Sequence, residues 1–147
     1  MDFPISTPQN AAAAAFIDRK VHRHLIGGEW VDSKSGECFD TFDPATGQSI
    51  GKIARGTKVE VDAAVVAARK AFSSGPWPSM LPIERSKLLW AIADKLEENI
   101  DELAELETLD QGKALYVGRW AEIPGAINQF RYFSGLATKI EGSTIPT

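Results

Sequence analysis

Apolar residues recur at helical spacing through the middle of the chain. Val61, Val65, Ala68 and Phe72 follow one another every three or four residues, a spacing that predicts a helix with one apolar face packed on a core. Gly75-Pro76-Trp77-Pro78 ends this helix. A second helix is predicted by apolar residues at the same spacing after Pro82, namely Leu88, Leu89, Ile92, Leu96 and Ile100.

Capping residues mark the ends of these helices. Thr57 and Glu60 have the spacing of a capping box, in which the hydroxyl and the carboxylate each bond a free backbone amide. Asn99 and Glu102 repeat that spacing and predict a third, acidic helix that runs through Leu109. Gly112 then suits the position after a helix C-terminus, because glycine adopts positive φ at little cost.

The two ends of the chain give weaker patterns. Residues 1–20 predict a flexible tail, in which a short helix over 11–17 would be marginal because no other segment offers its alanines a core. Near the other end, we expect a last helix from about Glu122 to Ala137, with Pro124 in its first turn. The following residues, Ile140 to Ile145, are expected to be extended.

Short strands are predicted between the tail and the helices. Leu25-Ile26 and Trp30-Val31 flank a Gly-Gly pair, and a further strand is expected from Cys38 to Phe42. Asp43 to Gly47 carries strong turn residues, and Ile50 to Ala54 predicts the returning strand. The pattern indicates a small antiparallel unit followed by a helical layer.

Composition restricts the class of protein. The 147 residues are 44% hydrophobic and carry a net charge of −4 with mixed signs, so neither nucleic acid nor membrane is expected as a partner. No apolar run approaches the ~20 residues that a membrane-spanning helix needs. The single cysteine cannot form an internal disulfide, which together with the lack of a recognisable leader predicts a cytoplasmic location.

Local chemistry predicts no catalytic site. Cys38 lies in a strand pattern without a nearby histidine, so we interpret it as structural rather than nucleophilic. His22 and His24 have no further partners at zinc spacing. The carboxylates from Glu97 to Glu107 are best explained as a solvated helix face, and no glycine-rich phosphate loop is present.

Five segments nevertheless occur in an order that points to one family: GGEWV, DPATG, VDAAVVAARKAF, ETLDQGK and RYFSGLATKIEG. Together they resemble the N-terminal portion of the NAD(P)-dependent aldehyde dehydrogenase superfamily. The resemblance implies an α/β fold, with residues 21–138 forming the N-terminal part of the cofactor-binding domain. It also implies a longer enzyme that oxidises an aldehyde to a carboxylic acid through a cysteine thiohemiacetal. The catalytic and cofactor-binding residues would then lie outside these 147 residues, which are expected to be inactive alone.

The resemblance also implies positions for other sites. Ala121 and Gly125 match residues of a helix that lines the substrate tunnel, although a helix–helix contact would require the same small side chains. Asp110, with the backbone near Thr41 and Phe42, matches a monovalent-cation site, although a helix-end hydrogen bond is an alternative. Arg131 is interpreted as a structural ion-pairing residue.

Further expectations concern substrate and assembly. Residues 139–147 match the start of a strand extension that joins subunits, which implies a homodimer or homotetramer of the full-length enzyme. The ATKIEG sequence and the small tunnel residues are similar to those of members that act on phenylacetaldehyde or related hydrophobic aldehydes, and betaine-aldehyde-type or general aliphatic enzymes are the alternatives. NAD or NADP is the expected cofactor. The alternative from another functional class is a truncated, non-catalytic helical module that serves binding or interaction.

Overall fold

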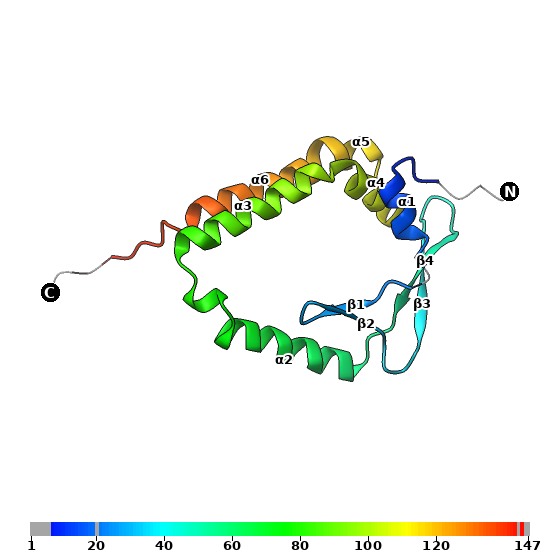
Figure 1. Cartoon of the computed structure of the whole chain (residues 1–147). Helices are drawn as coiled ribbons and strands as arrows, with labels where there is room; N and C mark the ends of the chain where they lie inside the picture. Colours follow the sequence, from blue (N-terminus) through cyan, green and yellow to red (C-terminus); the bar gives the residue numbers. More distant parts are fainter. Residues whose placement is uncertain (1–6, 20, 144, 146–147) are drawn as a thin grey trace.

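The computed structural model describes residues 7–19, 21–143 and 145 (Figure 1). Four strands follow a short first helix and precede the remaining helices. The first part comprises α1 (Ala11–Ile17), β1 (His24–Ile26), β2 (Glu29–Val31), β3 (Cys38–Phe42) and β4 (Ser49–Ala54). The second part comprises α2 (Lys58–Ser74), η1 (Trp77–Ser79), α3 (Pro82–Glu98), α4 (Ile100–Gln111), α5 (Leu115–Val117), the π-helical η2 (Gly118–Glu122) and α6 (Ile123–Leu136).

The strands form two separate antiparallel hairpins, as the sequence predicts. In the first, Leu25 of β1 lies opposite Trp30 of β2. In the second, Phe39 of β3 lies opposite Ile53 of β4. Asp43 holds the connecting turn, because its carboxylate accepts hydrogen bonds from the Ala45 amide and the Thr46 hydroxyl at 2.8 and 3.0 Å.

Helices α3 and α6 lie side by side and form the most extensive contact between the described elements (Figure 1). Ala93 of α3 and Ile127 of α6 are almost fully buried. The Ser134 hydroxyl, 1% exposed, donates to the Ser86 carbonyl oxygen at 2.8 Å and so remains satisfied in the contact. The last helical stretch begins earlier than predicted, since α5 and η2 precede α6 without a break.

Two of the three predicted caps are confirmed. The Thr57–Glu60 capping box is present at the start of α2, and Gly112 ends α4 with a φ of 73°. The Asn99–Glu102 capping box is wrong. The side-chain nitrogen Nδ2 of Asn99 instead donates to the Lys95 carbonyl oxygen at 2.7 Å, so this side chain caps the end of α3 rather than the start of α4.

The expectation that the alanine segment has no partner in the core is also wrong. Helix α1 forms over Ala11–Ile17 and packs on α4, with Ala13 fully buried. The backbone N–H of Asn10 donates to the Glu105 carboxylate of α4 at 2.8 Å. A contact between residues so far apart in the chain therefore stabilises a helix that would be marginal alone.

Helix α2 lies opposite α3 and α6, and the elements together trace an open ring (Figure 1). The predicted helix is confirmed, but none of the described residues covers its apolar stripe: Val65 and Phe72 are 61% and 70% exposed. The predicted extended segment is not assigned to a strand over residues 139–143 and 145, and residues 144, 146 and 147 lie outside the described part. Ile140 and Ile145 are both more than four-fifths exposed.

Candidate functional site

Ala121 and Gly125 share an exposed surface where η2 passes into α6. Ala121 belongs to the π-helical segment and Gly125 to the first turn of α6, and both are exposed. A Cβ atom built on Gly125 would meet no other atom of the described residues within 4 Å. The alternative explanation of Gly125, a close helix–helix contact, therefore finds no support within this part of the chain.

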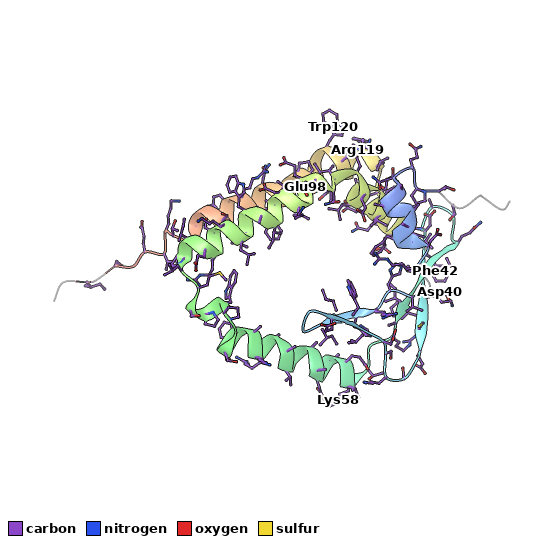
Figure 2. All side chains as sticks on the ribbon, viewed as in Figure 1. Asp40, Phe42, Lys58, Glu98, Arg119 and Trp120 are labelled. Carbon is purple, nitrogen blue, oxygen red and sulfur yellow. The ribbon has the colours of Figure 1, made fainter. Side chains whose placement is uncertain are left out.

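The same segment carries a large exposed aromatic side chain. Trp120 is 81% exposed, and Figure 2 shows its ring pointing away from the ring of elements. Beside it, Arg119 Nε lies 2.8 Å from Asp101 Oδ1 of α4. The π-helical segment is thus tied to α4 on one side and presents apolar surface on the other.

Thr41 and Asp110, which the sequence places on distant segments, are brought together. The Thr41 hydroxyl on β3 donates to Asp110 Oδ1 in the last turn of α4 at 3.0 Å. Phe42 follows at a register irregularity and is exposed. The two polar groups border a depression of about 450 Å³ between α1, α4 and the second hairpin. The hydrogen bond accounts for the carboxylate without an ion, and cation binding stays a prediction.

The histidines have structural surroundings. The His22 ring stacks on Phe16 with 4.6 Å between ring centroids, and burial together with the charge of Arg19 lowers the pKa of His22. Within residues 7–19, 21–143 and 145, no group of three or more His, Cys, Asp or Glu side chains could hold a metal ion. The structure therefore brings no metal-ligating set together around His22 or His24 in this part.

Arg131 forms ion pairs between α6 and α3, which confirms its predicted structural role. Its guanidinium lies 3.1 Å from Asp94 and 2.5 Å from Glu97, both on α3. Hydrogen bonds to Glu97 and Asp94 raise the pKa of Arg131. The group also lies over the Trp90 ring, at 5.4 Å from its centroid.

Cys38 is free and exposed at the start of β3. The residues on either side of Cys38 both contact Arg55. Its guanidinium lies over the Phe39 ring and forms an ion pair with Glu37. These contacts stabilise the edge of the hairpin. Nothing in this arrangement supplies a base to the thiol, in agreement with the structural interpretation.

Sequence reasoning missed one partly buried polar cluster. Lys113 Nζ lies 2.8 Å from Glu107 Oε1 on α4 and 3.3 Å from Glu122 Oε1 at the end of η2. Hydrogen bonding to Glu107 raises the pKa of Lys113. The signal was available in ETLDQGK: a left-handed glycine after α4 turns the chain back, and the following lysine then reaches the acidic residue one turn and a half earlier.

Known proteins are similar in sequence to this chain. A sequence profile of the "Aldehyde dehydrogenase family" matches residues 30–147. Aldehyde dehydrogenase family 2 member C4 of Arabidopsis thaliana is 48% identical over 126 residues, covering 86% of this chain and 25% of that protein. The mitochondrial benzaldehyde dehydrogenase of Antirrhinum majus is 46% identical over 143 residues, covering 92% and 27%.

Solved structures agree with these sequences. The aldehyde dehydrogenase of Bacillus cereus, determined as an NAD⁺ complex, superimposes with a TM-score of 0.90 at 39% identity. The match covers 94% of this chain and 28% of that structure. The chain thus spans about a quarter of the length of the proteins it resembles. Among the described helices, none is both long and apolar enough to cross a membrane.

Proposed function

We propose, from the premise that this chain belongs to the aldehyde dehydrogenase family, that it is the N-terminal portion of an enzyme that oxidises an aldehyde to a carboxylic acid. NAD or NADP would accept the hydride, as the NAD⁺ complex of the Bacillus cereus relative suggests. A cysteine nucleophile and its supporting groups would come from the rest of the polypeptide. We do not assign this role to Cys38, which is exposed at the start of β3, because a nucleophilic thiol needs a base or a cationic group beside it.

In this proposal the chain supplies scaffold and one wall of the substrate tunnel. The observation that carries it is the exposure of Ala121 and Gly125 where η2 joins α6, together with the open space around a Cβ atom built on Gly125. A wall of small residues admits wide aldehydes, because the volume absent from the wall is available to the substrate. This favours a hydrophobic or aromatic aldehyde, a class that the Antirrhinum majus relative has in its name.

The test enlarges the wall of the complete polypeptide to which the segment belongs. Ala121→Leu and Gly125→Leu should raise KM for phenylacetaldehyde by about tenfold or more relative to KM for acetaldehyde, since an added apolar side chain blocks the wider substrate first. Ala15→Leu makes the same change at an exposed position of α1 and should leave both values unaltered. Equal KM changes for the two aldehydes would place Ala121 and Gly125 outside the tunnel.

Three finer assignments accompany this proposal. Asp110, with Thr41 and the backbone of Phe42, would hold a monovalent cation. This assignment would be supported if K⁺ stabilises the wild-type protein but not the Asp110→Asn variant. Residues 139–147 would join subunits of a homodimer or homotetramer, which sedimentation of the complete polypeptide would measure. A cytoplasmic location rests on the single cysteine. The alternative of a non-catalytic helical module receives no support from the family comparison.

A further inference from the structure

The π-helical segment η2 is an unusual piece of backbone in this chain. It spans Gly118–Glu122 between the short α5 and the long α6. A π turn adds one residue to an α-helical path, and one residue corresponds to about 100° of rotation around the axis. The side chains that follow therefore face a direction that an uninterrupted α-helix would not give them.

Close packing fixes the start of this segment on α4. Gly118 is buried, and a Cβ atom built there would lie 3.3 Å from the Ala104 Cβ and 3.3 Å from Glu107 Oε2. The backbone consequently approaches α4 more closely than a larger residue would allow. This contact places the first residue of the π turn directly above the Glu107 carboxylate.

Ion pairs fix the rest of the segment. Lys113 joins Glu107 on α4 to Glu122, the last residue of η2, through the 2.8 and 3.3 Å contacts. The Lys113 and Glu107 side chains are only 26% and 18% exposed, so solvent screens this pair less than a surface pair. A second ion pair to α4 joins Arg119 to Asp101.

The Glu107 carboxylate depends on Lys113 for its compensation. Its second oxygen, Oε2, is buried and has no hydrogen-bond partner among the described residues. Removing the ammonium would leave a largely buried carboxylate without its ion pair, and Glu122 would lose the contact that holds it toward α4. Of these ion pairs, only the one formed by Arg119 would then hold the π turn on α4.

We propose that Lys113 is a positioning residue that holds η2 in its π-helical register and thereby sets which aldehydes the tunnel admits. The reason is geometric: Ala121 lies inside η2 and Gly125 follows its last residue by three positions, so a change of the turn from π-helical to α-helical register would rotate both away from their present direction. The proposal rests on the proposed function of that surface. It adds the residue that controls the surface and the property, substrate width, that this residue controls.

The experiment compares Lys113→Met with wild type in the complete polypeptide, and measures structure and kinetics separately. Amide hydrogen exchange in peptides covering residues 115–125 should become about tenfold faster, because the turn opens more often. The ratio of KM for phenylacetaldehyde to KM for acetaldehyde should change at least about fivefold. Lys113→Arg keeps the charge and should restore most of both values.

Two further variants make the result decisive. Lys95→Met removes an exposed lysine that pairs with Glu98 on α3 and should alter neither quantity. Glu122→Gln removes only the half-exposed end of the cluster and should reproduce the kinetic change even if Lys113→Met does not fold.

Unchanged exchange over 115–125 would overturn the positioning role. Faster exchange with an unchanged KM ratio would overturn the control of substrate width and leave Lys113 a stabilising residue only. If the wild-type polypeptide oxidises no aldehyde, the proposed function fails while the exchange data still decide the positioning of η2.

Discussion

Replacing Gly112 by alanine tests how tightly the end of α4 is built. Gly112 has a φ of 73°, and an added Cβ would lie 2.8 Å from the Pro44 Cγ atom. Gly36 has nearly the same φ, 70°, but no atom lies within 4 Å of a Cβ built there. The two glycines therefore share a left-handed backbone conformation that would strain an alanine, and they differ in the space around them.

The expected cost follows from these two observations. An alanine in the left-handed region costs about 1–2 kcal/mol at either position. At Gly112 the Pro44 ring or the helix end must also shift, and overpacking of this kind typically adds about 1–3 kcal/mol. We therefore expect Gly112→Ala to cost about 2 kcal/mol more than Gly36→Ala.

Native-state hydrogen exchange measures the effect of each substitution at the amide of the substituted residue, in comparison with wild type. The Gly112 amide donates to the Thr108 carbonyl at 2.8 Å, and the Gly36 amide donates to the Ser33 carbonyl at 3.0 Å. A difference of about 2 kcal/mol corresponds to about thirtyfold more acceleration at position 112 than at position 36, after correction for intrinsic rates. Equal acceleration at the two positions would refute the claim that Pro44 packs against the end of α4.

Other perturbations address the caps, the ion pairs and the cysteine. Three hydrogen-bonding groups, the Thr57 hydroxyl and the amides of Lys34 and Thr57, lower the pKa of Glu60 from 4.5 to about 2. Since the folded-state pKa is depressed, the stabilisation is present above about pH 4.5 and is lost as the pH falls toward 2. Glu60→Gln should remove this acid sensitivity from hydrogen exchange of α2, and an unchanged pH profile would contradict it. Arg131→Met should lower the urea concentration at the midpoint of unfolding, because the guanidinium pairs with two carboxylates. Arg131→Lys should lower it less, and equal decreases would argue against the ion pairs. Cys38→Ser should leave aldehyde oxidation by the complete polypeptide within about twofold of wild type, and loss of turnover would give this exposed thiol a catalytic role.

Features encoded by neighbouring residues were predictable from the sequence. The Thr57–Glu60 box and the Gly112 cap each depend on groups within one helical turn, and both are present. The hairpins follow from alternating residues around glycine turns. Asn99 had the same local signature as Thr57, yet its amide bonds the preceding helix, because α3 ends directly before α4 and competes for that side chain.

Features that depend on distant partners were not predictable. Helix α1 is fixed by Glu105, which lies 95 residues from Asn10, and no local pattern announces that contact. The π turn arises from an inserted residue in a helical path, and the 3.6-residue period alone does not reveal it. The apolar stripe of α2 was read correctly as helical, but no described segment of this chain covers it. The family resemblance supplied Ala121 and Gly125 as proposed tunnel residues, and the structure added the ion pairs of Lys113 with Glu107 and Glu122.

Purified chain 1–147 and the complete polypeptide, assayed side by side for aldehyde-dependent reduction of NAD and NADP, test the central claim most directly. We predict turnover by the complete polypeptide and none by residues 1–147, because in the proposed function the chain supplies scaffold and tunnel wall while the nucleophile comes from the rest of the polypeptide. Turnover by the 147-residue chain that thiol alkylation abolishes would contradict this account and make Cys38 the catalytic residue.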